Sequence, residues 1–170
     1  MAYFLNKPIV IVPYDPQWPL LYAQEAAHIL AATGGIVLAL AHIGSTAVPG
    51  LGAKPIIDML AAVPDLDAVD SCTAALQHLG YIDARIQVSD RRLFCKGPYN
   101  EGTHHLHFVQ PGSAAWQLPL QFRDFLRSHP PAMQHYAALK QELAATYGAD
   151  LNGYTDGKGP FIAAALRSND

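Results

Sequence analysis

The chain has few charged residues, only two cysteines and no long hydrophobic run. Asp, Glu, Lys and Arg make up 15% of its 170 residues, whereas hydrophobic residues make up 51%. Disordered chains show the opposite balance, so this composition predicts a folded protein. A chain of this length can bury roughly two thirds of its unfolded surface. We therefore expect one domain that spans residues 1–170.

The chain also lacks an excess of basic residues. It has 11 Lys and Arg residues against 14 Asp and Glu residues, which gives a formal net charge of −3. Proteins that bind nucleic acids usually carry a basic surface, so this balance argues against a nucleic-acid partner. A small molecule is the expected ligand, and a nucleic acid held by a local basic patch is the alternative.

The sequence contains no signal for a membrane or for export. Its longest apolar runs have about half the roughly 20 residues that a spanning helix needs. The N-terminal stretch "MAYFLNKPIVIVPYDPQW" has no positively charged segment before an apolar run. Cys72 and Cys95 lack C-x-x-C spacing, which is typical of free buried thiols in a reducing compartment. We expect a cytoplasmic protein that does not contact a membrane.

The hydrophobic pattern predicts a mixed α/β region followed by helices. Strands are expected over 8–13 (an edge strand), 35–44, 54–63, 81–88, 91–97 and 103–110, with a polar turn at Ser89-Asp90. Helices are expected over 15–33, 65–80, 113–128, 131–147 and 160–168, with a break over 148–160. This order predicts an α+β fold: a mixed sheet of about five strands, flanking helices and a helical C-terminal third.

A Gly-Ser pair and one aspartate interrupt the apolar segment 41–60. Gly44 permits a sharp turn where a strand ends, and Ser45 supplies a hydroxyl. Small loops of this kind bind phosphate. Asp58 lies inside the next strand, where an unpaired carboxylate is costly to bury, so it should face a cleft, a cation or a basic partner. A tight turn and a carboxylate bonded to backbone amides are the alternative.

Three histidines lie close together in "GTHHLHFV". On a strand, His105 and His107 point to one face and His104 to the other. Two imidazoles with this spacing can share a metal ion, or bind phosphate when they are protonated. The alternative is one packed histidine and one that bonds to the backbone.

Several basic residues are candidates for phosphate contacts. Lys54 precedes a proline that restricts its backbone, Lys158 lies between two glycines, and Arg123 shares a helix face with Arg127. A solvated charge or an ion pair is the alternative for each of them. That alternative is the preferred interpretation for Arg127 and Lys140.

Four segments together resemble the GrpB family. They are "HIGSTAVPGLGAKPIID", "THHLHFV", "FRDFLRSHP" with "YAALKQELA", and the terminal Tyr, Lys and "FI", and they span about residues 14–162. That family is placed in the DNA-polymerase-β-like nucleotidyltransferase superfamily. The superfamily signature is Gly-[Gly/Ser], about a dozen residues, and then Asp-x-[Asp/Glu] on a strand. The resemblance implies a nucleotidyltransferase-like fold.

The chain departs from that signature in Asp58-Met59-Leu60, where Leu60 replaces the second acid. Nucleotidyl transfer usually needs a metal ion between carboxylates and substrate phosphates. By resemblance, the His pair lies about where the third acid of the superfamily would be. The implied site comprises catalytic Asp58, a divalent Mg²⁺, Mn²⁺ or Zn²⁺ ion on Asp58, His105 and His107, and nucleotide or phosphate contacts from Gly44, Ser45, Lys54, Arg123 and Lys158.

The expected function is binding of a nucleotide or related phosphate compound, with metal-dependent nucleotidyl or phosphoryl transfer as the activity that the resemblance suggests. Two alternatives remain open. One is a non-catalytic ligand-binding or interaction module that retains the fold, and the other is a metal-dependent hydrolase built on His and Asp. Strand alternation places Leu60 on the same face as Asp58, so we expect both side chains to face the cleft.

Overall fold

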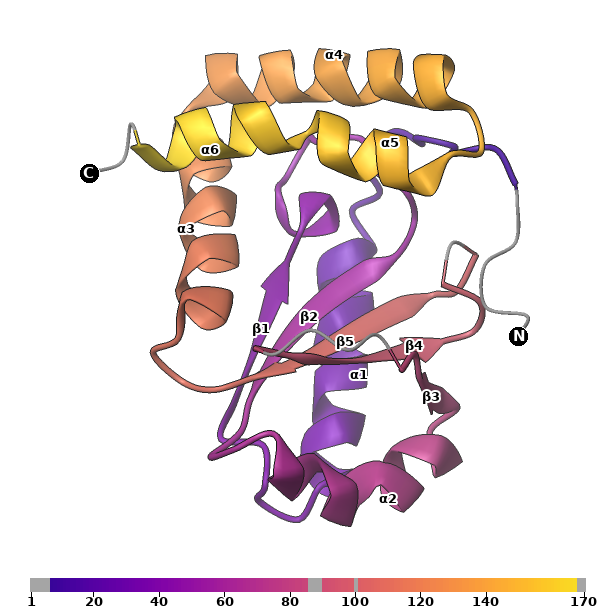
Figure 1. The fold of residues 1–170 in the computed structure, drawn as a ribbon, viewed down its shortest axis with the longest axis vertical. Coiled ribbons are helices and arrows are strands. Elements are labelled where there is room, and N and C mark those ends of the chain that lie inside the picture. Colours follow the sequence, from indigo (N-terminus) through magenta and orange to yellow (C-terminus); the bar gives the residue numbers. More distant parts are fainter. Residues whose placement is uncertain (1–6, 86–89, 100, 168–170) are drawn as a thin grey trace.

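The computed structural model describes residues 7–85, 90–99 and 101–167. Its centre is a five-stranded sheet in the order β1-β2-β5-β4-β3 (Figure 1). The strands are β1 (Ala39–Ile43), β2 (Ile57–Ala62), β3 (Tyr81–Asp83), β4 (Arg92–Lys96) and β5 (His104–Val109). β2 and β5 are parallel, and the other neighbouring pairs are antiparallel. The predicted mixed sheet is confirmed.

Helices cover the sheet and form the C-terminal third of the chain, as predicted. They are α1 (Trp18–Ala32), α2 (Thr73–His78), α3 (Ala114–Ser128), α4 (Pro130–Tyr147), α5 (Leu151–Gly157) and α6 (Gly159–Arg167), with 3-10 turns η1 (Ser45–Ala47) and η2 (Asp67–Cys72). Figure 1 shows α1 crossing one face of the sheet, while α4, α5 and α6 gather at one end of the molecule.

The two faces of the sheet carry different side chains. The face toward α1 is apolar and holds the main core, which includes Trp18, Ile29, Ile57, Met59, Ala61, Phe94, Leu106 and Phe108. The alternate residues of β2 and β5 point to the opposite face. Asp58 pairs in register with His105, and Leu60 with His107. The parallel pairing of β2 and β5 therefore places the predicted polar residues side by side.

The N-terminal predictions need correction. Segment 8–13 makes only the single bridge Val12–Ala53; its flanking prolines lack the amide hydrogen that a longer ladder needs. The first helix begins at Trp18, three residues later than predicted. The N-cap is Gln17, whose amide donates a hydrogen bond of 2.8 Å to Oδ1 of Asp15.

Three later predictions also differ from the structure. The predicted helix 65–80 divides into η2 and α2, although it ends before Gly80 as expected. The predicted break 148–160 contains α5, because Asp150 accepts hydrogen bonds from the amides of Asn152 and Gly153 and so caps this helix. β3 covers only the first three residues of 81–88. Residues 86–88 and the turn residue Ser89 lie outside the described residues.

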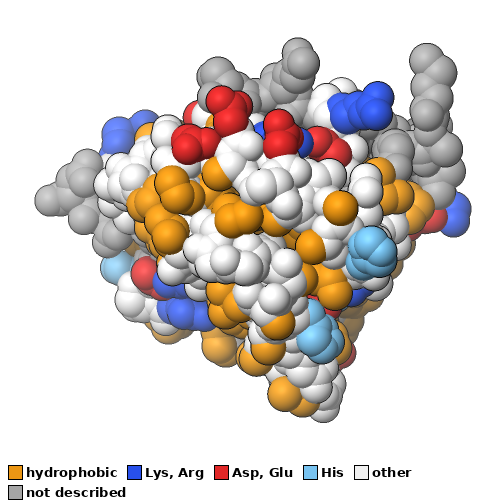
Figure 2. All heavy atoms as spheres, turned by 90° about the horizontal axis from the view of Figure 1, so that it is seen from below, with side chains coloured by type: hydrophobic (Ala, Val, Ile, Leu, Met, Phe, Trp, Pro, Cys, Tyr) orange, Lys and Arg blue, Asp and Glu red, His pale blue; other side chains and the backbone are white. Residues whose placement is uncertain are grey.

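The surface mixes apolar and charged groups. Figure 2 shows apolar side chains in scattered patches, with acidic side chains gathered toward one edge of that face.

Cys72 and Cys95 are buried and free, as predicted. Within the described ranges, no helix is both long and apolar enough to cross a membrane.

Candidate functional site

A cavity of about 420 Å³ lies against the polar face of the sheet. β2, β5 and the loops that precede them line one part of it, and α3, α4, α5, α6 and the junction of α5 with α6 line another. The predicted site residues that line this cavity are Gly44, Ser45, Lys54, Asp58, His105, His107 and Lys158. Arg123 is the predicted residue that does not. Residues from widely separated segments therefore meet in one place.

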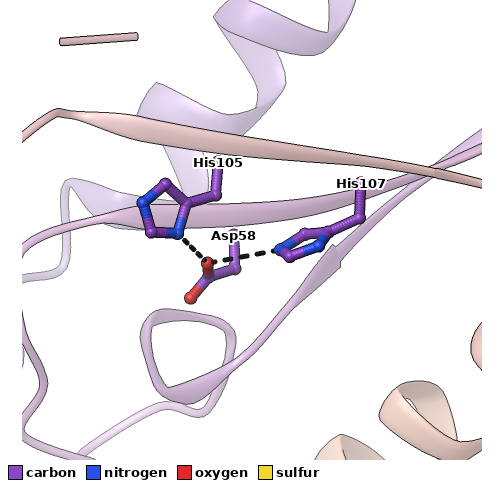
Figure 3. Close-up of side chains that lie close together, drawn as sticks. All are labelled: Asp58, His105 and His107. Carbon is purple, nitrogen blue, oxygen red and sulfur yellow. Dashed lines mark hydrogen bonds and ion pairs between the residues drawn. The ribbon is translucent and has the colours of Figure 1, made fainter. Parts of the chain in front are cut away.

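Asp58, His105 and His107 form a compact group on the cavity wall (Figure 3). His105 Nδ1 lies 3.0 Å from Asp58 Oδ1, and His107 Nε2 lies 3.9 Å from the same oxygen. One possible ligand atom from each residue lies within 4.8 Å of the others. Carboxylate oxygens and imidazole nitrogens are both metal ligands, so this donor set fits a divalent cation. As strand alternation predicted, His104 is absent from the cavity lining.

The orientation of His105 is fixed on both sides of its ring. Its Nε2 donates a hydrogen bond of 2.8 Å to the carbonyl oxygen of Tyr99. The ring also stacks on the Tyr99 ring, with centroids 4.7 Å apart. Nδ1 consequently faces Asp58. A backbone carbonyl that holds one imidazole nitrogen is the usual arrangement for a histidine that coordinates a metal through the other.

Asp58 is ionised in this environment. Burial alone would raise the pKa of its carboxyl, but the contacts with His105 and His107 outweigh burial and hold the pKa well below its usual range. Its side chain keeps 30% of its surface exposed. The carboxylate is therefore charged and open to the cavity.

Gly44 is required where it lies. Its φ of +70° is a conformation that side chains disfavour, and a Cβ on this residue would lie 2.7 Å from Asp58 Oδ2. The backbone of the Gly-Ser turn thus lies too close to the carboxylate for a side chain at this position. Ser45 and Asp58 line the same cavity.

Three lysines reach the cavity from separate segments. Lys54 lies before β2, Lys140 on α4, and Lys158 between α5 and α6. The ammonium groups of Lys54 and Lys158 lie 5.9 Å and 4.4 Å from the centroid of the Tyr154 ring. Burial lowers the pKa of Lys54, although Asp58 opposes this effect. Burial and then Lys54 lower the pKa of Lys158 to about 8. Lys158 is the C-cap of α5 and directly precedes α6, so only a single turn residue separates the two helices here.

Lys140 is the residue that sequence reasoning missed. Its side chain is only 2% exposed, and its ammonium donates to Ser45 Oγ at 2.8 Å and to the carbonyl of Gly52. Burial and then Lys158 lower its pKa to about 7. No ion pair found in the described part of the chain involves Lys140. The predicted solvated charge is wrong, because this amine is buried and has no carboxylate partner among the residues that the structure describes.

Arg123 forms an ion pair, which was the alternative to a phosphate contact for this residue. Its guanidinium donates to both carboxylate oxygens of Asp124 at 2.8 Å and 3.0 Å, and to the carbonyl of His42 at 2.9 Å. All three guanidinium nitrogens of Arg123 therefore donate to these local partners and not into the cavity. Arg127 donates to the carbonyl of Ala47 at 2.9 Å and 2.6 Å, which ties α3 to η1.

Leu60 does not face the cavity, so that expectation is wrong. It shares a face with Asp58, but it is only 2% exposed and packs with Ile43, Val109 and Ala115. α3 covers this part of the sheet through Ala115. The position of the missing second acid is therefore part of an apolar core.

The sequence and the fold match known proteins. The pattern of one family, described as "GrpB protein", matches residues 8–168. The chain is 36% identical over 161 residues to the UPF0157 protein YqkA of Bacillus subtilis, and the match covers 94% of this chain and 47% of that protein. The chain thus spans about half the length of this relative.

Two solved structures are similar to the fold. The protein GrpB from Enterococcus faecalis is 33% identical, with a TM-score of 0.84, over 94% of this chain and 96% of that one. The Cid1 poly(U) polymerase, in a structure bound to MgATP, has a TM-score of 0.50 and 12% identity over 77% of this chain and 45% of that one. The second similarity confirms a nucleotidyltransferase-like fold and nothing finer.

Proposed function

Because this chain belongs to the GrpB family and has a nucleotidyltransferase-like fold, we propose that its cavity binds a nucleotide or related phosphate compound and supports metal-dependent nucleotidyl or phosphoryl transfer. One observation carries the proposal. The same cavity holds three lysines and, on the sheet, the group of Asp58, His105 and His107. Ammonium groups bind phosphate, and carboxylate with imidazole binds divalent cations.

The charge of the cavity favours an anionic ligand. Three lysines face one carboxylate among the lining residues. Burial lowers the pKa of all three lysines because an ammonium group loses its water there. A phosphate would compensate for the water that these ammonium groups lose, above all for Lys140, which has no carboxylate partner among the described residues.

Each part of the cavity has a role in this proposal. Ser45 and the three lysines hold the phosphates. Asp58, His105 and His107 would hold the metal ion, which when bound neutralises phosphate charge and stabilises charge that develops at phosphorus. Leu118, Phe122, Ile162 and Leu166 form an apolar wall for the uncharged part of the ligand. Asp58 lies between the metal group and the phosphate-binding turn, because it contacts His105 and lies against Gly44, next to Ser45.

A non-catalytic ligand-binding module is the second candidate. The burial of Leu60 favours it, because the acid that completes the superfamily signature cannot be replaced from this position. The transferase and the module bind the same ligand, but only the transferase converts it to a product. Transfer to an acceptor indicates the transferase, release of the group into water indicates a metal-dependent hydrolase, and binding without turnover indicates the module.

A thermal-shift screen of nucleoside triphosphates with and without Mg²⁺, Mn²⁺ and Zn²⁺ tests the proposal. A ligand at 100 times its Kd stabilises a protein by about 2.7 kcal/mol, which raises Tm measurably. We expect such a shift for the wild type, and a smaller one for Lys158→Met. The matching nucleosides are the control. Equal shifts with nucleosides, or none with any nucleotide, would reject the proposal.

A further inference from the structure

We propose that the group of Asp58, His105 and His107 takes a transition-metal ion of the Zn²⁺ or Fe²⁺ class in preference to Mg²⁺, with His105 coordinating through Nδ1. The inference rests on the proposed function for the role of the ion, but it concerns only which ion these residues select. It departs from the all-oxygen magnesium coordination that the superfamily signature implies.

The first argument is the donor set. Two of the three side chains offer imidazole nitrogen, and Asp58 is the one carboxylate among the residues described as lining the cavity. Mg²⁺ prefers six oxygen ligands, whereas imidazole suits Zn²⁺ and Fe²⁺. Two histidines and one carboxylate are an established ligand set for both of these ions. Leu60, packed beneath α3, supplies no further oxygen.

The second argument is the proton on His105. A carbonyl oxygen only accepts hydrogen bonds, so Tyr99 fixes a proton on Nε2 of His105. In the neutral ring, Nδ1 then presents its lone pair to Asp58 Oδ1 at 3.0 Å. Either a second proton on Nδ1 or a metal ion must lie between these two atoms, and a metal ion uses both of them as ligands.

The third argument is the state of His107. Its Nε2 faces Asp58 Oδ1 at 3.9 Å, which is too long for a hydrogen bond. Ligand atoms around a tetrahedral ion with bonds of about 2.0–2.1 Å lie roughly 3.3 Å apart. The two distances from Asp58 Oδ1 lie on either side of this value, so His107 must move toward Asp58 to complete the set.

Metal binding without any nucleotide tests the inference. Calorimetric titrations of the wild type with Zn²⁺ and with Mg²⁺ give the affinity for each ion, and Co²⁺ as a spectroscopic substitute for Zn²⁺ reports coordination by nitrogen. We expect Zn²⁺ to bind at least about 100-fold more tightly than Mg²⁺, and Co²⁺ to give a visible spectrum that excess Zn²⁺ removes. His105→Gln and His107→Gln should each weaken Zn²⁺ binding by at least about tenfold.

His104→Gln is the matched control. It removes an imidazole from the same strand, but His104 is not among the residues that line the cavity. It should leave Zn²⁺ affinity and the Co²⁺ spectrum unchanged, and circular dichroism checks that each variant is folded. Equal affinities for Mg²⁺ and Zn²⁺, no binding of Zn²⁺ without nucleotide, or an equal loss in all three variants would each overturn the inference. Nucleotide binding that persists in those cases would leave the proposed function standing.

Discussion

Lys140 shows how one buried amine can indicate a ligand. The ammonium donates to Ser45 Oγ and to the carbonyl of Gly52, and these neutral oxygens do not balance its charge. Its burial is therefore costly in the free protein unless the amine loses its proton or an anion enters. The sequence held a signal for this burial: Tyr136, Lys140 and Leu143 have helical spacing and all lie on the buried side of α4.

Replacing Lys140 separates binding from stability. Lys140→Met keeps an apolar chain of similar length and removes the charge. We expect affinity for a nucleoside triphosphate to fall by about tenfold or more, because a charge-assisted hydrogen bond contributes roughly 1.5–3 kcal/mol. The free energy of unfolding should change little or rise, because an unpaired buried charge is removed. Calorimetry and urea titrations measure the two quantities.

Arg167→Met is the control for this variant. Arg167 is an exposed basic residue at the end of α6, and it does not line the cavity. Its loss should leave nucleotide affinity unchanged. An equal fall in affinity for both variants would mean that overall charge, and not the cavity, governs binding.

The pKa of Lys140 also predicts a pH dependence of stability. Its pKa is lowered to about 7 in the folded protein, from an ordinary value of 10.5. Between these values the unfolded chain keeps the proton and the folded protein loses it, so the free energy of unfolding rises with pH. We expect wild-type protein without ligand to gain stability relative to Lys140→Met between pH 7 and pH 8.5. Urea titrations that give parallel pH profiles would contradict this assignment.

At the scale of elements, the turn after β1 controls the geometry of Asp58. Gly44→Ala imposes an unfavourable φ, which costs about 1–2 kcal/mol, and also places a Cβ against Asp58 Oδ2. Gly34→Ala imposes a similar φ of +60° where a Cβ meets nothing within 4 Å. We expect Gly44→Ala to destabilise the protein more than Gly34→Ala in urea titrations. Of the two variants, only Gly44→Ala should weaken metal binding. Equal metal affinities for the two variants would refute the close contact between Gly44 and Asp58.

The strand β2 carries a second prediction at Leu60. Leu60→Asp buries a carboxylate among Ile43, Val109 and Ala115, so the free energy of unfolding should fall by several kcal/mol, roughly 3 or more. Mg²⁺ affinity should not improve, because the new acid does not reach the cavity. Leu60→Met, which keeps the volume, should cost less than about 1.5 kcal/mol. A stable Leu60→Asp protein with tighter Mg²⁺ binding would show that α3 does not seal this position.

Strand periodicity predicted which residues lie on the polar face of the sheet. Tertiary packing determines which of those residues are open to the cavity. The alternation of β5 places His105 and His107 together and His104 opposite, because that alternation is local to the backbone. The same rule placed Leu60 with Asp58, but it cannot show that α3 covers one residue and leaves the other open. Asp150 is a typical helix-capping residue, but the three glycines that follow it disfavour a helix, so the sequence did not predict α5.

At the scale of the whole molecule, the cavity depends on chain segments that lie far apart in the sequence. Lys54 comes from the loop before β2, Lys140 from α4, and Lys158 from the junction of α5 with α6. No local pattern states that they meet; only the packing of the C-terminal helices over the sheet brings them together. The net charge of −3 also conceals this basic group, because acidic side chains elsewhere outnumber it.

The binding of one nucleoside and its mono-, di- and triphosphates, measured by calorimetry at a fixed concentration of metal ion, tests the central claim most directly. If the lysines hold phosphate beside the metal group, affinity rises with each added phosphate, the bare nucleoside binds weakly or not at all, and Lys140→Met flattens the series. If the nucleoside binds as tightly as its triphosphate, or if no member of the series binds the wild type, this cavity is not a phosphate site.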